Sequence, residues 1–395
     1  MKNKDELRMS RIAAAQKISD ACKEGNQDAL KEGLTELCAD IEAQILEEAN
    51  NLRGETDAAV LAQRGVRQLT SEEKEYYNTL ILAMKANGKE NVKMALSNVD
   101  KTFPITIIND VMEDMKQAHP LLQAIDAKNV TGLTKWLMNT DEGASATWDE
   151  LEAEITKEIA SGFKDVPLDQ MKLSAWMPIS QDMLELGPNW LDAYIRTCLS
   201  EALSIGLETG IVTGTGKNMP IGMDRQVQEN VVTVGGVYPK KEAIAIYDLK
   251  PATYGDLISR LAESEEGKPR VVNGLIMIVT PQDYYKIVMP ATTVLLPNGT
   301  YMNDVLPIPT KIIQSVAVAK DEAILGIGKK YFLGVGGKRG IQFSDDAAFL
   351  ADKRLYKIVA YANGRAKDNN AFLRLDISGL KRLIPEVLTV DPANF

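Results

Sequence analysis

The chain has 395 residues, with 45 Lys and Arg against 55 Asp and Glu, which gives a formal charge of −10. It exceeds the roughly 250–300 residues at which one hydrophobic core stops growing, so we expect more than one folding unit. With 45% apolar and 25% charged residues the composition is that of a folded globular protein. An acidic chain without a basic cluster is not a dedicated reader of DNA or RNA, because phosphate contacts need clustered Lys and Arg.

The cysteines, the charged N-terminus and the uncharged stretches argue against four further classes of protein. Cys22, Cys38 and Cys198 form neither an even framework nor a C-x-x-C pair, which argues against a disulfide scaffold or a zinc module and favours a reducing compartment. The charged N-terminus predicts no secretory signal. The longest uncharged stretch, Ile287 to Asn303, contains two prolines and a glycine, so we interpret it as strand and loop and predict no membrane insertion.

The chain has one histidine, His119, and the residues that common catalytic sites need around a histidine are missing from the motifs. Pro120 follows it and favours an extended backbone, so we expect a structural or surface histidine. Gly214 to Lys217 resembles the end of a phosphate loop, but Ile211 stands where the first glycine belongs. We therefore predict turns at the glycines, no catalytic, metal or cofactor site, and a protein that is not an enzyme.

Residues 1–90 contain no proline and carry apolar residues at helical spacing, which predicts an all-helical section. A stripe at intervals of four, three, four and four marks a helix that packs on another helix; it consists of Leu30, Leu34, Leu37, Ile41 and Ile45. Gly25 and Asn26 separate this helix from an earlier one. A third is expected to begin with Ser71 as its N-cap. The section is either a solvated accessory domain or a device for self-association.

After Pro104, the first proline, strand-like segments alternate with a few helices, which predicts an α+β fold. One long helix is expected from Pro188 to about Val212, with an apolar face. The expected strands are Ile105–Ile108, Leu173–Ile179, Val231–Val234, Leu275–Val279, Ile312–Val318, and Leu355–Tyr361 paired with Ala371–Ile377. Between Thr140 and Lys172 two interpretations compete: an amphipathic helix from Thr147 to Ile159, or a long exposed hairpin.

Two runs joined by the long helix resemble the major capsid protein family of tailed bacteriophages. The first is KLSAWMPISQDMLEL at 172–186, and the second is GTGKNMPIGM at 214–223. In that family a strand-to-helix passage leads into a spine helix that ends in a glycine- and proline-containing turn. The resemblance covers about residues 104–385, and residues 1–90 occupy the place where some members carry a fused scaffolding segment.

The resemblance implies a phage capsid fold, shared with encapsulins, and a division of the chain into regions. These are a helical scaffolding-like section at 1–90, an N-terminal arm at 91–118, a peripheral domain with the spine helix at 119–139, 176–223 and 353–395, an extension loop hairpin at 140–175, and an axial domain at 224–352. Under this interpretation the hairpin replaces the helix suggested for 147–159. Candidate contacts to a neighbouring subunit are then Trp148, Glu150, Phe163 and Lys164. The spine helix is expected to pack through Leu191, Tyr194, Ile195, Cys198, Ala202 and Leu207.

The resemblance also implies the function: self-assembly through hexamers and pentamers into an icosahedral virion shell around double-stranded DNA, in the host bacterial cytoplasm. Expected partners are other copies of the chain, a portal protein, a maturation protease or decoration protein, and the packaged DNA through non-specific contacts. Some relatives join subunits through Lys–Asn isopeptide bonds, for which only the residue types are present here. The alternatives are an encapsulin-like nanocompartment shell and a soluble α/β enzyme of unknown chemistry.

Overall fold

A computed structural model describes residues 4–51, 67–85, 119–130, 134–139, 163–168, 171–179, 183, 185–228, 231–344 and 354–383. The arm expected at 91–118, with the strand expected at Ile105–Ile108, lies outside these residues. So does 140–162, where the helix and hairpin interpretations compete. In the part described, the mixed helix and strand content confirms the α+β class.

The N-terminal section is helical, as its periodicity predicts. It forms α1 (Lys4–Glu24), α2 (Gln27–Asn51) and α4 (Ser71–Lys85). Gly25, at φ 69°, makes the turn between α1 and α2, and the Asn26 side chain caps α2 by accepting hydrogen bonds from the amides of Asp28 and Ala29. The N-cap of α4 is Thr70, not Ser71 as predicted, because Thr70 and Glu73 form a reciprocal capping box.

The long helix α9 runs from Pro188 to Thr213, close to the predicted span. Its 26 residues at about 1.5 Å each give a rod of roughly 39 Å. Pro188 occupies the first turn, where a missing N–H breaks no helical hydrogen bond. At the other end the helix stops at Gly214, where a Cβ would lie 2.2 Å from the Pro220 carbonyl oxygen, so the following turn requires glycine.

Among the described residues, the strands form two larger sheets and two pairs of antiparallel strands. The four-stranded sheet has the order β1-β11-β12-β4, with bounds Asp126–Val130, Tyr331–Ser344, Arg354–Ala366 and Met171–Ile179. The five-stranded sheet has the order β5-β13-β10-β6-β9, with bounds Ala243–Ala245, Phe372–Asp376, Glu322–Ile327, Leu275–Val279 and Thr310–Gln314. The two pairs are β2–β3 (Thr134–Asn139, Phe163–Leu168) and β7–β8 (Val294–Leu295, Tyr301–Met302).

The predicted pairing of Leu355–Tyr361 with Ala371–Ile377 is wrong. Strand β12 pairs with β11 and β4, whereas β13 pairs with β10 and β5 in the other sheet. A turn at Asn369–Ala371 redirects the chain between them, and the buried Lys241 ammonium holds it by donating to the carbonyls of Asn369 (2.6 Å) and Phe372 (2.8 Å). Consecutive strands therefore enter different sheets, because a side chain from elsewhere fixes the turn.

The strand predicted at Val231–Val234 is also wrong. The only pairing there is an isolated bridge between Val234 and Val237 around Gly235 and Gly236, which have φ of 62° and 83°. Val232 and Val234 are more than 80% exposed, so β-branched residues at this turn gain no burial that would favour a longer strand.

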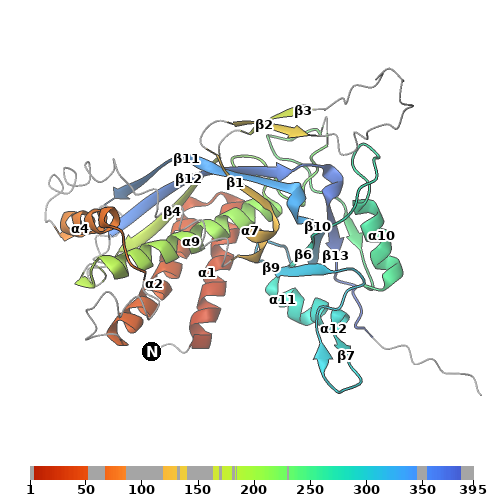
Figure 1. The fold of residues 1–395 in the computed structure, drawn as a ribbon, viewed down its shortest axis with the longest axis horizontal. Coiled ribbons are helices and arrows are strands. Elements are labelled where there is room, and N and C mark those ends of the chain that lie inside the picture. The colour runs from red at the N-terminus through yellow and green to blue at the C-terminus, as the bar shows by residue number, and fades with distance from the viewer. Residues whose placement is uncertain are drawn as a thin grey trace, which may run out of the picture.

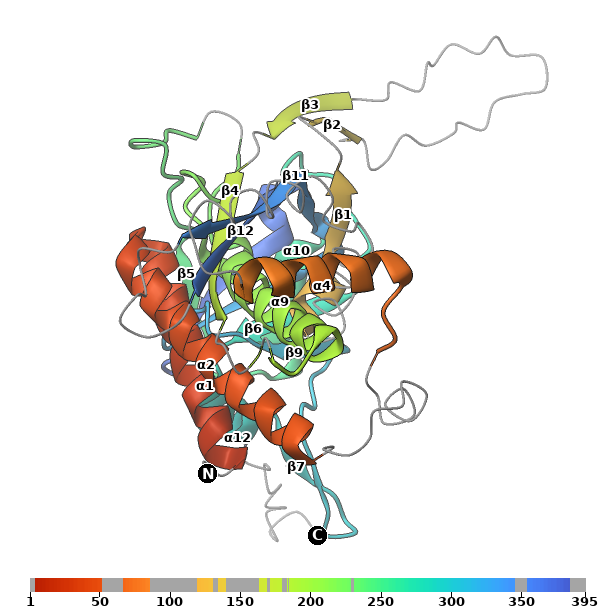
Figure 2. The same ribbon diagram turned by 90° about the vertical axis from the view of Figure 1, so that its left-hand side faces the viewer.

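Helix α9 packs against both the four-stranded sheet and the hairpin of α1 and α2, and α2 also contacts strand β4 of that sheet (Figures 1 and 2). One hydrophobic core joins all three layers and continues onto one side of the five-stranded sheet. A second core lies between that sheet and α10 (Pro251–Leu261), the π-helical turn Tyr284–Val288 that follows the short helix α11 (Pro281–Asp283), and α12 (Met289–Thr292). Within the described residues, no helix has the length and hydropathy of a membrane span.

Candidate functional site

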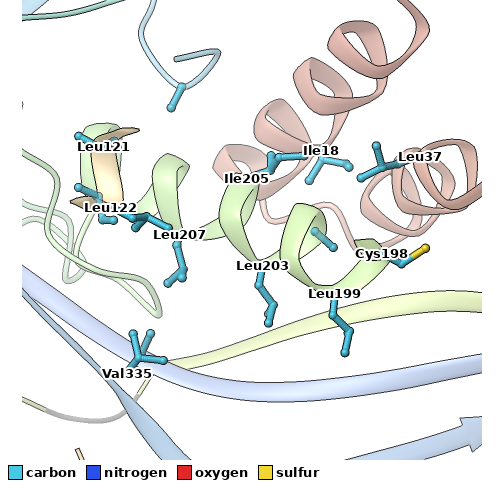
Figure 3. Packing of buried hydrophobic residues seen from close by; sticks show 14 of the residues in the cluster. Ile18, Leu37, Leu121, Leu122, Cys198, Leu199, Leu203, Ile205, Leu207 and Val335 are labelled. Carbon is cyan, nitrogen blue, oxygen red and sulfur yellow. The ribbon is translucent and has the colours of Figure 1, made fainter. Parts of the chain in front are cut away.

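The spine helix α9 presents apolar side chains to two partners at once. All six residues expected to pack from it are buried: Leu191, Tyr194, Ile195, Cys198, Ala202 and Leu207. In Figure 3, Leu199, Leu203 and Leu207 point toward the strands, while Cys198 and Ile205 point toward the N-terminal helices. The helix is therefore the shared core element of the sheet and of the N-terminal section.

The stripe predicted on α2 lies in the same core as α9. Leu34, Leu37 and Ile41 are each only 1% exposed, Ile45 is buried, and Leu30 is half-buried. Because the chain's own helices cover this stripe, it is not a free surface for a second copy in this arrangement. A role of the stripe in contacts between subunits stays a prediction.

Buried polar contacts fix α4 on the spine helix. The Tyr77 hydroxyl donates to Asp192 Oδ1 at 2.8 Å, and both groups are almost fully buried. Arg67 lies 2.9 Å from the Glu73 carboxylate and 3.8 Å from that of Asp192, so it compensates both charges. Burial raises the pKa of Tyr77 well above its usual value and also raises that of Asp192. Such contacts fix position, because a slipped helix would leave charges buried without partners.

A second set of polar contacts joins the α1–α2 hairpin to α9. The Thr209 hydroxyl donates to Ser19 Oγ of α1 at 3.1 Å, and both residues are buried. Cys38 of α2 and Cys198 of α9 lie side by side, and burial raises the pKa of the Cys198 thiol well above its usual value. A thiol in that state is a packing group and not a nucleophile.

His119 anchors the start of the short helix α7 (Pro120–Ala124) to the spine helix. Its Nδ1 lies 3.1 Å from Glu208 Oε1, and the other oxygen of that carboxylate accepts from the Ser315 hydroxyl at 2.8 Å. Burial lowers the pKa of His119, but the hydrogen bond and charge of Glu208, with the charge of Glu201, outweigh it, so the pKa is raised overall. Lys329 holds the far end of α7 through two backbone carbonyls.

The glycine-rich passage after α9 forms turns, as predicted. The turns also predicted at Gly326, Gly334 and Gly336 are wrong, because Gly326 lies within β10 and the other two lie within β11. It leads to Asp224, a fully buried carboxylate whose pKa burial raises. The nearest cations are Arg225, with Nε at 3.3 Å, and Lys240, with Nζ at 3.7 Å. This group of charges lies where the spine helix gives way to the segment that feeds the five-stranded sheet, so it fixes the junction between the two parts of the fold.

Of the four residues predicted to contact a neighbouring subunit, two lie within the described part of the chain and two lie outside it. Phe163 and Lys164 open strand β3, where they pair with Asn139 and Met138 of β2. Trp148 and Glu150 lie outside the described residues. All four remain predictions as contacts to a neighbouring subunit.

Sequence reasoning missed the polar anchors of the N-terminal section. A hydroxyl on α4 and a carboxylate on α9 are 115 positions apart, and no spacing rule links them. The one available signal was Asp192 itself, an acidic residue on the apolar face of the predicted spine helix, which had to find a partner once buried. Among the described residues, no group of His, Cys, Asp and Glu could hold a metal ion.

Comparisons with known proteins give one family match and several remote structural likenesses. A model of the phage capsid family matches residues 101–377. One similar solved structure is the satellite phage P4 procapsid with its size determination protein, at 12% identity over 69% of this chain and 99% of that chain, with a TM-score of 0.43. Another is the capsid of a native GTA particle, at 13% identity over 65% of this chain and 89% of that chain, with a TM-score of 0.42. A virus-like particle from Pyrococcus furiosus is also similar, at 13% identity over 69% of this chain and 99% of that chain, with a TM-score of 0.38. No curated protein matches the sequence.

The structural likenesses are remote, so the assignment depends on the family match. That match spans well over half of the chain and includes the spine helix, both large sheets and the turn that follows the helix. The helices α1, α2 and α4 lie before it. The chain therefore belongs to the phage capsid family, and it is a major capsid protein, a structural subunit of an icosahedral shell.

Proposed function

We propose that this chain forms the shell around the double-stranded DNA of a tailed phage, and that its N-terminal helices act as a fused scaffold during assembly. One observation carries the scaffold proposal. Helices α1, α2 and α4 precede the family match, yet they are bound to the spine helix through a common core and buried polar contacts. Because these helices are fixed to the spine helix, their contacts with a neighbouring subunit would also fix the orientation of the spine helix relative to that subunit.

The proposed mechanism is geometric. Identical subunits joined by heterologous contacts close into rings, and rings close into a shell if neighbouring subunits meet at a fixed angle. Contacts between the N-terminal helices of adjacent subunits would set that angle, because these helices cannot turn independently of α9. Met9 and Ile12 on α1 are 72% and 41% exposed, so they are available for such contacts.

The remaining partners follow from the same function. A shell that receives DNA needs an entry complex, so a portal protein is proposed, with a maturation protease or a decoration protein as further partners. Assembly is proposed to take place in the host bacterial cytoplasm. The net charge of −10 suits loose, non-specific contact with packaged DNA, because an acidic subunit does not retain the phosphate backbone as it moves.

Deleting residues 1–90 tests the scaffold proposal, which predicts misassembled or wrongly sized particles by electron microscopy. The deletion also uncovers the apolar face of α9, so a variant that keeps the core is needed beside it. Met9→Asp combined with Ile12→Asp changes only exposed side chains and should give the same assembly defect at an unchanged melting temperature. Val271→Asp, at an 82% exposed position outside the section, is the matched control. Particles of normal size from the Met9 and Ile12 variant would reject the scaffold role.

A further inference from the structure

The β7–β8 hairpin carries apolar side chains that the described part of the chain leaves largely exposed. Leu295, Tyr301 and Met302 are 58%, 73% and 53% exposed. The hairpin ladder is two residue pairs long, and Figures 1 and 2 both show it projecting from the body. A ribbon this short gains little stability on its own, and grouped apolar side chains in water mark an interaction surface.

The same hairpin contains much of the chain's longest uncharged stretch, Ile287 to Asn303. A quarter of all residues in the chain are charged, yet this projecting segment has none. The missing charges do not help the solubility of an exposed loop. They do favour docking of the hairpin into an apolar site, because no charged group has to lose its hydration.

An open hollow of about 470 Å³ lies beside the base of the hairpin. It is formed by the start of β6, the start of β9 and the segment between β8 and β9. Its apolar lining includes Leu275, Leu306, Ile308 and Pro309, and Thr310 and Lys311 line it as well. Asp304 also lines it, but its carboxylate accepts the Tyr284 hydroxyl at 2.9 and 3.2 Å. Strand β9 is an outer strand of its sheet, so the hollow lies at a sheet edge.

The hairpin cannot fill the hollow of its own subunit. It starts at the rim, since Asp304 follows β8 almost directly, and the exposure of Leu295 and Tyr301 shows that its tip does not fold back. A shell built from many copies of one chain supplies an identical hairpin from the next subunit. The tip and the hollow are different surfaces, so a tip that enters the hollow of the next subunit without a return insertion between the same two subunits makes a heterologous contact, the kind that closes rings.

We propose that Leu295, Tyr301 and Met302 of one subunit dock into the hollow at Leu306, Ile308 and Pro309 of the next subunit in the ring. The inference rests on the shell assembly proposed above and adds the surface through which subunits join within a ring. The hairpin is the inserted part, and the edge beside β9 is its receptor.

A cross-linking experiment on assembled particles tests the contact directly. Tyr301→Cys and Pro309→Cys are placed in separate chains with Cys22→Ser in both, so that the remaining native thiols, Cys38 and Cys198, are buried. The two chains carry tags of different size, are assembled together and are treated with a short bismaleimide. A cross-linked dimer containing both tags is expected from the mixture and not from either chain alone.

Closed particles without that mixed dimer would overturn the inference and leave the capsid function intact. An equally strong dimer from the Tyr301→Cys chain alone would also overturn it, because the tips would then pair with each other. Failure of the unmodified protein to form any particle would instead count against the shell assembly and, with it, the ring contact.

A charge introduced at the tip gives a second measurement. Tyr301→Asp should lower the yield of particles at least tenfold, because the carboxylate would lose its hydration among Leu306, Ile308 and Pro309. Lys311 also lines the hollow, so Tyr301→Lys, which it would repel, should lower the yield as well. Val271→Asp, at an 82% exposed valine that also lies within the residues of the family match, is the matched control and should assemble normally. All three should melt at the wild-type temperature, since both positions are exposed. Normal assembly of Tyr301→Asp would contradict the proposed contact.

Discussion

At the scale of single residues, the only histidine has a structural task that depends on pH. The folded-state pKa of His119 is raised above its ordinary value of 6.5. The stability that it contributes is therefore fully present below about pH 6.5 and is lost as pH rises through the higher folded-state pKa. The groups around it are Glu201 and Glu208 on α9 and Ser315 beyond β9.

His119→Gln is expected to remove this dependence. The variant should unfold more easily than the wild type by about 1.5 kcal/mol at pH 5.5, the contribution typical of a charge-assisted hydrogen bond, and the difference should shrink toward pH 8.5. Chemical denaturation across this range measures it. A difference that stays constant with pH would show that the histidine contributes only by packing.

The pKa of Lys241 is shifted in the opposite direction, so its effect on stability has the opposite pH dependence. Burial lowers its pKa from 10.5 to about 8, so between these values the unfolded chain binds more protons than the folded one. Stability should therefore rise with pH across this window. Lys241→Met should abolish the rise and cost about 1–3 kcal/mol at pH 7.5, because two carbonyls lose their donor. Urea denaturation of both proteins from pH 7.5 to 9.5 measures the two slopes, and parallel slopes would exclude the buried ammonium as their cause.

At the scale of elements, the N-terminal helices form part of the core around α9. Tyr77→Phe removes the hydroxyl that satisfies the buried Asp192 and should loosen α4 at a cost of about 1.5–3 kcal/mol. Hydrogen exchange should then rise in Ser71–Lys85 and stay unchanged in the five-stranded sheet. Tyr247→Phe, at a 61% exposed tyrosine, is the control and should change neither. Equal protection of α4 in both variants would mean that packing alone holds it.

Sequence periodicity predicted single elements better than their pairing. The spine helix and strand β6 lie where their apolar residues predicted them. The helix was predicted from its 3.6-residue apolar period, and β6, buried at all five positions, from its continuous apolar run. The partner of β12 could not be predicted from neighbouring sequence, since Lys241, more than 120 positions away from Asn369, holds the turn that separates β12 from β13. The anchors of α4 and α1 were missed for the same reason: they join residues that only the tertiary fold brings together.

At the scale of the whole molecule, the spine helix links a four-stranded sheet on one side to N-terminal helices on the other, and the β7–β8 hairpin projects from the distant five-stranded region. Surfaces for contact are thus spread over well-separated parts of one subunit, as heterologous assembly needs.

The charges at Asp224 hold the junction between the parts. Asp224→Ala should leave each sheet intact and widen the size distribution of particles, which electron microscopy measures; a uniform population would argue against a role of this junction in curvature.

Electron microscopy of the purified full-length protein after size-exclusion chromatography is the most direct test of shell formation. Closed icosahedral particles built from this chain are expected, because the family match, the spine helix and the separated contact surfaces all belong to a shell subunit. A monomer or small oligomer under every solution condition tried would contradict it.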